Sequence, residues 1–126
     1  MKLFCRDEMQ RLEMAAVTAG ITLAQLMENA GAALAQEVES RCRPIQGKRA
    51  VLLCGKGNNG GDGFVCAGLL AQRGMTCTVV LTQGEPKTDL AGDAFSRMPD
   101  QVQVISGAEE REQAEAAMTA AAVIVD

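Results

Sequence analysis

The chain has 126 residues, a net charge of −4 from 12 Lys and Arg against 16 Asp and Glu, and no His, Trp or Tyr. The lack of His excludes a Ser-His-Asp triad, a Cys-His pair and any zinc site that uses His, so chemistry here must use carboxylates, amides, Lys, Cys or bound ions. The acidic balance and only three Phe argue against nucleic-acid binding, which needs a basic surface and stacking platforms.

The cysteines and the N-terminus bear on the compartment. Five cysteines, an odd number without CxxC spacing, favour buried reduced thiols; they stand at positions 5, 42, 54, 66 and 77. Charged residues at 6–8 interrupt the place of a signal peptide, and no apolar run approaches the roughly 18 residues of a membrane span. We therefore expect a soluble, cytoplasmic protein without a membrane partner.

The first 42 residues are expected to be helical. Residues 6–18 predict a short helix with Met9, Leu12 and Ala16 on one side and Gly20 as its end. A second helix follows immediately along the chain. The segment 6–42 is therefore a helical region that precedes any sheet.

The second helix carries its own start signal. Thr22 and Gln25 have capping-box spacing, in which each side chain satisfies a backbone N–H of the other. Apolar residues then recur at helical spacing and mark a buried stripe: Leu23, Leu26, Met27, Ala30, Leu34 and Val38.

From residue 50 onward, strands and helices alternate. We expect strands at 50–54, 75–82, 101–105 and 121–125, and helices at 64–73, 88–98 and 108–119. The first strand is a continuous apolar run, which is typical of a strand covered on both faces. The alternation predicts βαβ units over 50–126 and hence an α/β fold with a mostly parallel sheet.

The most specific feature is the segment 55–63, expected as a loop between the first strand and the next helix. Gly55, Gly57 and Gly60 satisfy GxGxxG, in which glycines let the backbone approach a pyrophosphate at a helix N-terminus. The acidic residue that would bind the ribose hydroxyls after the second strand is missing. The segment also does not match the Walker A pattern. A dinucleotide-binding fingerprint is therefore present only in part.

Polar side chains in this segment offer both ligand and structural interpretations. Asn58 and Asn59 can donate and accept hydrogen bonds or give oxygen to a hard cation, but turn formation is an equally good explanation. Asp62 suits a ribose hydroxyl, a water or an ammonium-like group, and its structural alternative is a plain N-cap.

The run GKGNNGGDGFVCA at 55–67 resembles the NAD(P)H-hydrate epimerase family (YjeF N-terminal domain), together with LMENAG at 26–31 and VIVD at 123–126. The resemblance implies a Rossmann-like three-layer α/β/α domain with two N-terminal helices. It also implies an isomerase that interconverts the R and S forms of hydrated NADH and NADPH. Asn29 gains interest as an amide that could hold the glycine loop.

The resemblance also implies the site residues. Substrate-binding positions carried over by the motif are Asn58, Asn59, Gly60, Gly61 and Asp62. A potassium ion would be held by Asn59 and Asp126, both expected at the carboxyl ends of parallel strands. No catalytic acid or base is assigned, because part of the family's machinery follows position 126.

Residues 1–126 are therefore expected to form an incomplete domain that is inactive or poorly folded alone. The resemblance implies a homodimer with the N-terminal helices as contacts, and in many bacterial relatives a fused ADP- or ATP-dependent dehydratase. Two other functions stay open: an NAD(P)-dependent dehydrogenase on the same loop, and a non-catalytic binding or scaffold module.

Overall fold

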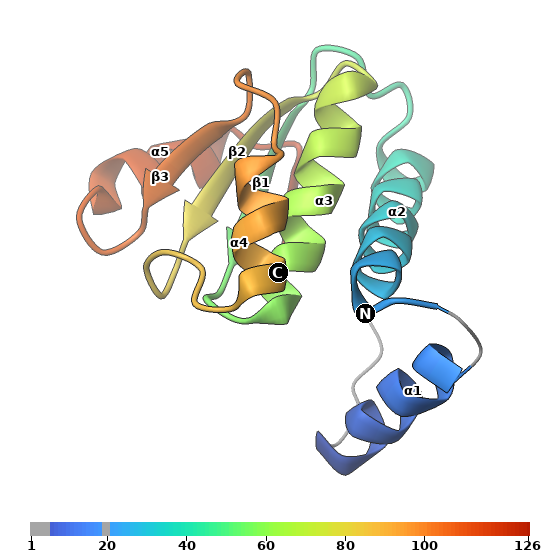
Figure 1. Cartoon of the computed structure of the whole chain (residues 1–126). Helices are drawn as coiled ribbons and strands as arrows, with labels where there is room; N and C mark the ends of the chain where they lie inside the picture. Colours follow the sequence, from blue (N-terminus) through green and yellow to red (C-terminus); the bar gives the residue numbers. More distant parts are fainter. Residues whose placement is uncertain (1–5, 19–20) are drawn as a thin grey trace.

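The computed structural model describes residues 6–18 and 21–126 (Figure 1). The helices are α1 (Arg6–Thr18), α2 (Leu23–Cys42), α3 (Asn58–Gln72), α4 (Asp89–Ser96) and α5 (Arg111–Ala120). The strands are β1 (Arg49–Cys54), β2 (Thr76–Leu81), β3 (Gln103–Ser106) and β4 (Val123–Val125).

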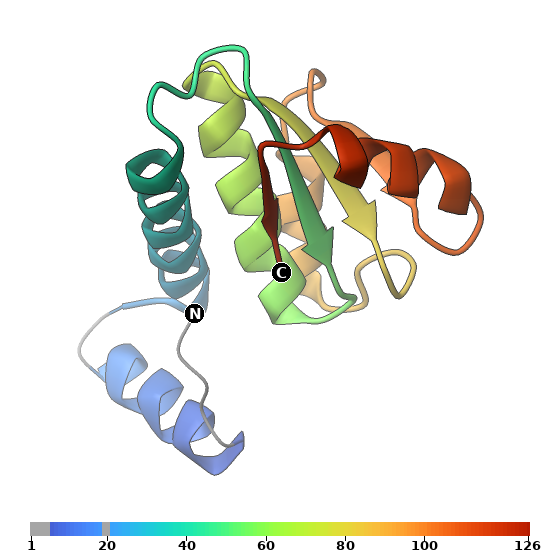
Figure 2. The same cartoon turned by 180° about the vertical axis from the view of Figure 1, so that it is seen from behind.

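The four strands form one parallel sheet in the order β3-β2-β1-β4, as the alternation predicts. Helices α3 and α4 cover one face and α5 covers the other (Figures 1 and 2). The predicted three-layer α/β/α, Rossmann-like architecture is therefore confirmed. All strands run the same way, so their carboxyl ends meet at one edge of the sheet.

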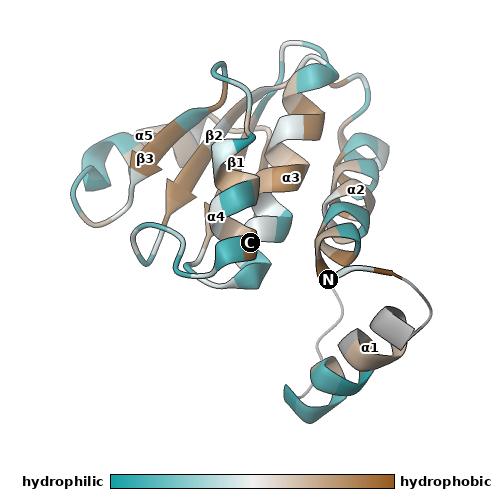
Figure 3. Ribbon diagram, viewed as in Figure 1, coloured by the Kyte–Doolittle hydropathy of each residue, from teal (hydrophilic) through white to brown (hydrophobic). Residues whose placement is uncertain are grey.

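Side chains of the central strands alternate between two cores. Leu52 of β1 packs in the larger core with Phe64 and Leu70 of α3, all three essentially inaccessible to solvent. The neighbouring Val51 packs in the smaller core, against α5. Residues 50–54 of β1 are apolar, as is typical of a strand covered on both faces. In Figure 3 the strands that can be seen are coloured mainly as hydrophobic.

Helix α2 lies against α3 at a point of close approach. A Cβ on Gly31 would lie closer than 3 Å to the Val65 side chain, so glycine is needed there. The Thr22 hydroxyl accepts the Gln25 backbone N–H at 3.0 Å, which confirms half of the predicted capping box. The reciprocal half is wrong, because the Gln25 amide instead donates to the Asn29 Oδ1 one turn further on.

Helix α1 and strand β4, at the two ends of the described chain, expose apolar side chains to solvent. On α1, Met9 and Leu12 are exposed, and the helix extends away from the sheet (Figure 1). The predicted end of this helix at Gly20 lies outside the described residues. Strand β4 is shorter than predicted and lies at an edge of the sheet, where Ile124 is 44% exposed.

The cysteines within the described residues are free thiols. Cys54, Cys66 and Cys77 are buried, and Cys42 is partly buried. Burial raises the pKa of the Cys54 and Cys66 thiols to about 12 and that of Cys77 to about 11, so these thiols stay protonated and unreactive. Cys5 lies outside the described residues. None of the described helices has the length and apolar character needed to cross a membrane.

Candidate functional site

The loops that follow β1 and β2 are joined at the carboxyl edge of the sheet. The backbone N–H of Lys56 donates to the Gln83 Oε1 at 3.2 Å, and the N–H of Lys87 donates to the Lys56 carbonyl at 2.8 Å. The Thr82 N–H and hydroxyl both donate to the Cys54 carbonyl. These bonds hold the first residues of α3 in a defined position beside the loop that leads into α4.

The structure corrects the predicted loop at 55–63, because α3 begins at Asn58 rather than at Phe64. Several of its glycines are packed too closely against neighbouring elements to accept a side chain without a shift. A Cβ on Gly60 would lie closer than 3 Å to the carbonyl oxygen of Gly55, and one on Gly61 would collide with the side chain of Met27. The glycine-rich turns of α3 are therefore pressed between β1 and α2.

Gly57 differs from these glycines. It is the N-cap of α3 in extended backbone, φ −94° and ψ −167°, which other residues adopt readily. A Cβ there would meet nothing within 4 Å, and no side chain caps the helix. The Gly60 N–H donates to the Gly57 carbonyl at 3.0 Å. The backbone N–H groups of Asn58 and Asn59, for which the described residues provide no acceptor, and the positive end of the helix dipole therefore remain available to an anionic ligand.

The two asparagines begin α3 and are both exposed. They form the opening turn of the helix, across which the Gly60 N–H donates to the Gly57 carbonyl at 3.0 Å. The Asn58 Oδ1 accepts a hydrogen bond from the Thr88 hydroxyl, which also caps α4 by accepting the Ala91 N–H. Asn59 is the next residue along the same helix turn. The predicted polar pair thus lies where α3 and α4 begin side by side.

Asp62 lies in the second turn of α3 and is partly buried. The N-cap interpretation is wrong, because Gly57 holds that position. Burial raises the pKa of the Asp62 carboxyl from 3.8 to about 6. The side chain is therefore mostly ionised at pH 7, yet it can take up a proton near neutral pH, as groups at functional sites often do.

Asp126 follows β4, in which Val125 pairs with Leu52 of β1. It therefore lies at the same edge as the start of α3 (Figure 2). Asp126 and Asn59 are exposed oxygen donors of the kind that hard cations prefer. Across residues 6–18 and 21–126, no three His, Cys, Asp or Glu side chains gather as a metal cluster. The potassium pairing stays a prediction.

Three further residues have contacts near the start of α3 that the sequence analysis did not predict. Gln83 and Thr88 follow β2. Their position near the start of α3 could have been predicted, because loops that follow neighbouring parallel strands meet at one edge of the sheet. Met27 was weighed mainly as core, but it contacts α3 at Gly61. Asn29, the amide expected to hold the loop, bonds instead within its own helix.

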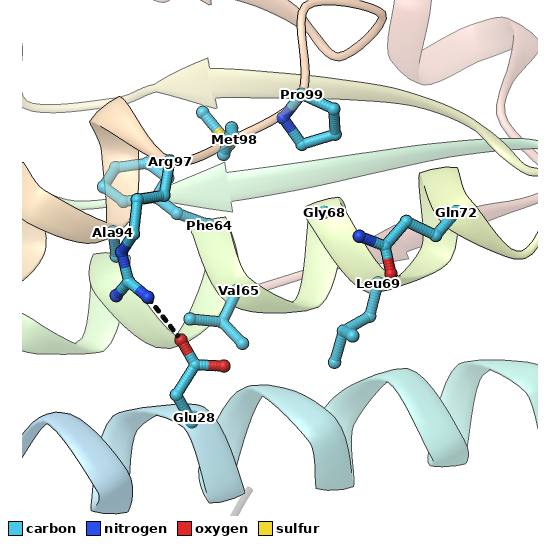
Figure 4. Close-up of a pocket in the computed structure, with 10 residues that line it drawn as sticks. All are labelled: Glu28, Phe64, Val65, Gly68, Leu69, Gln72, Ala94, Arg97, Met98 and Pro99. Carbon is cyan, nitrogen blue, oxygen red and sulfur yellow. Dashed lines mark hydrogen bonds and ion pairs between the residues drawn. The ribbon is translucent and has the colours of Figure 1, made fainter.

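Two hollows lie elsewhere. One of about 160 Å³ runs along α3 between α2 and the end of α4, where Arg97 and Glu28 pair at 3.1 Å (Figure 4). Another of about 480 Å³ lies beneath α5 near the amino ends of the strands, beside Arg49 and Thr76. None of the predicted site residues lines either of them.

The comparisons with known proteins identify the family of this chain. The family described as YjeF-related protein N-terminus matches residues 23–126. The chain belongs to this family. The match includes every predicted site residue and both helix starts at the carboxyl edge. The YjeF-related chain thus has its glycine-rich motif at the start of α3.

Named relatives of this YjeF-related chain are enzymes of nicotinamide cofactor repair. It is 46% identical over 83 residues to a bifunctional NAD(P)H-hydrate repair enzyme Nnr of Thermanaerovibrio acidaminovorans, covering 66% of this chain and 16% of that one. It is 41% identical over 86 residues to an NAD(P)H-hydrate epimerase of Rhodobacter capsulatus, covering 64% of this chain and 41% of that one.

A solved structure of the yeast protein ynu0 (YNL200c) is similar over the whole chain. The TM-score is 0.79 at 27% identity, with 100% of this chain and 56% of the yeast chain covered. The chain thus spans less than two thirds of the length of each of these three proteins.

Proposed function

We propose that the protein is an NAD(P)H-hydrate epimerase, an isomerase that interconverts the R and S forms of hydrated NADH and NADPH. The observation that carries the proposal is the start of α3. Its glycines bring the helix close to β1, while Gly57 provides no side-chain cap, so a ligand can reach the N–H groups of Asn58 and Asn59. The relatives named as an NAD(P)H-hydrate epimerase and an NAD(P)H-hydrate repair enzyme support the choice of substrate.

In this proposal the pyrophosphate lies at the N-terminus of α3, where backbone N–H groups and the helix dipole stabilise its charge. Asn58 and Asn59 provide side-chain amides, and Asp62 accepts a hydrogen bond from a ribose hydroxyl or a water. A potassium ion held by Asn59 and Asp126 would offset part of the pyrophosphate charge. Two side-chain oxygens are a partial shell, which backbone carbonyls and water would complete.

The dehydrogenase alternative is less well supported. An NAD-binding domain places an acid after the second strand to grip the ribose. Here Gln83 follows β2, and its amide oxygen accepts the Lys56 N–H. The Gln83 side chain thus joins the loops after β1 and β2, and it is not an acid that could bind a ribose.

The assembly is part of the same proposal. We expect a homodimer, since Met9 and Leu12 expose 39% and 50% of their surface on α1. Replacing Leu12 by Asp should shift the protein from dimer to monomer in sedimentation velocity, whereas an unchanged dimer would exclude α1 as the contact. The cytoplasm remains the expected compartment because the described cysteines are free thiols. A fused dehydratase is proposed by analogy with the bifunctional relatives.

The test uses hydrated NADPH enriched in one epimer and follows the ratio of the two forms by NMR. The full-length protein should restore the equilibrium ratio much faster than buffer does. Asn59→Ala and Asp62→Asn should each slow this by more than about tenfold, because each removes a hydrogen-bonding group from the site.

Asn29→Ala is the matched control for these variants. It also removes an exposed amide, but one on α2 whose hydrogen bond goes to Gln25. Its rate should match that of the unmodified protein. Full epimerisation by both site variants would show that the site is elsewhere, and an inactive unmodified protein would refute the proposed function.

A further inference from the structure

Thr88 makes two hydrogen bonds through a single oxygen, and they join the starts of two helices. Its Oγ1 accepts the backbone N–H of Ala91 at 3.0 Å, which caps α4. The same hydroxyl lies 2.5 Å from the Oδ1 of Asn58, the first residue of α3. Thr88 therefore caps α4 and also contacts Asn58 in the proposed substrate site.

The length of the second bond defines its direction. Hydrogen bonds between two oxygens have lengths of about 2.5–3.0 Å, whereas an amide nitrogen donates over about 2.7–3.2 Å. A distance of 2.5 Å therefore identifies the Asn58 atom beside Thr88 as the carbonyl oxygen. The hydroxyl proton has no other acceptor among the described residues, so it is directed at Asn58.

This direction decides what Asn58 offers to a ligand. With Oδ1 held by Thr88, the amide NH₂ has no hydrogen-bond partner within the described part of the chain, and Asn58 is exposed. We infer that Thr88 is a positioning residue that orients Asn58 as a hydrogen-bond donor. The matching group is an acceptor oxygen, such as a pyrophosphate oxygen, and not a donor such as a carboxamide NH₂. This inference rests on the proposed function for the identity of the ligand.

Two substitutions at Thr88 separate positioning from capping. Thr88→Ser keeps the cap and the hydroxyl proton. Thr88→Asp also keeps the cap, because Asp and Ser are both strong N-cap residues, but an ionised carboxylate has no proton to donate. The Asn58 amide would then turn its NH₂ group toward the new carboxylate, and this NH₂ group could no longer donate to a ligand.

We expect both variants to melt within a few degrees of the unmodified protein. Thr88→Ser should keep its KM for hydrated NADPH, whereas Thr88→Asp should raise KM about tenfold with a much smaller change in kcat. Equal KM values for the two variants would overturn the positioning role.

The charge of Asp requires its own control. In an Asn58→Ala background, Thr88→Asp should raise KM no further if it acts through Asn58. A full tenfold rise in that background would mean that the charge repels the ligand directly, and the inference would be wrong.

A spectroscopic measurement is independent of activity. In ¹⁵N-labelled protein, the Asn58 side-chain NH₂ signals should move and exchange more slowly in Thr88→Asp, and stay in place in Thr88→Ser. Unmoved signals in Thr88→Asp would overturn the orientation even in an active epimerase. An inactive unmodified protein with the expected spectra would refute only the proposed function.

Discussion

Helices α3 and α4 begin beside each other at the same edge of the sheet, each after a parallel strand, yet their first turns are built differently. α4 is capped by its own Thr88, and a Cβ on its Gly92 would meet nothing within 4 Å. α3 begins at the uncapped Gly57 and carries four glycines, each less favourable than Ala by about 0.5–1 kcal/mol in a helix.

The two helix starts differ in how closely they pack and in whether a side chain caps them. In α4 the third backbone N–H of the first turn is bonded by the Thr88 side chain, whereas in α3 the equivalent Gly60 N–H is bonded by the Gly57 carbonyl. α3 gives up intrinsic stability to lie close to β1, and it has no side chain at its N-cap that would stand between a ligand and the N–H groups of Asn58 and Asn59. This is the arrangement expected where an anion completes the helix end.

The largest effect should come from the packed glycine. Gly60→Ala should lower the free energy of unfolding by about 3 kcal/mol, because the new methyl group would collide with the Gly55 backbone. Urea unfolding followed by circular dichroism measures this change.

Gly92→Ala is the matched control in α4. It should raise the free energy of unfolding by about 0.5–1 kcal/mol, because Ala is the better helix former and the space is open. Equal effects of the two substitutions would mean that the two helix starts do not differ in packing.

A smaller effect is expected at Asp62. The pKa of the Asp62 carboxyl is about 6 in the folded protein, above the ordinary 3.8, because burial disfavours the charged form. The folded protein is therefore destabilised progressively as the pH rises from about 4 to 6 and this carboxyl ionises. Asp62→Asn should therefore unfold less readily at pH 8 by about 1 kcal/mol, after allowance for solvent screening.

The advantage of Asp62→Asn should grow between pH 4 and 6 and then level off, which unfolding curves at several pH values can test. The same variant should lose epimerase activity. An advantage that is constant from pH 3 to pH 8 would show that the Asp62 pKa is not raised.

The smallest effect on stability should come from the open N-cap. Gly57→Ser should raise the free energy of unfolding by about 0.3 kcal/mol, because Ser caps a helix somewhat better than Gly. It should nonetheless raise KM for hydrated NADPH, since the added side chain occupies the ligand's approach. Unchanged KM with higher stability would indicate that no ligand comes close to Gly57.

The sequence was informative wherever local chemistry decides the structure. Apolar runs predicted the strands of a parallel sheet, and Thr22 predicted the start of α2. It misplaced the start of α3 by treating the glycines after Asn58 as a loop. Glycine marks both loops and close packing, and only the positions of Gly55, Met27 and β1 distinguish them.

For this protein the sequence by itself determined the α/β class, the parallel sheet and the glycine-rich motif with its two asparagines and Asp62. Periodicity and motif are properties of neighbouring residues, so they can be read along the chain. The tertiary structure decided that the motif is a helix, that Asp62 has a raised pKa, and that Thr88 contacts Asn58. These features arise from burial and from contacts across 30 residues of chain, which no local pattern records.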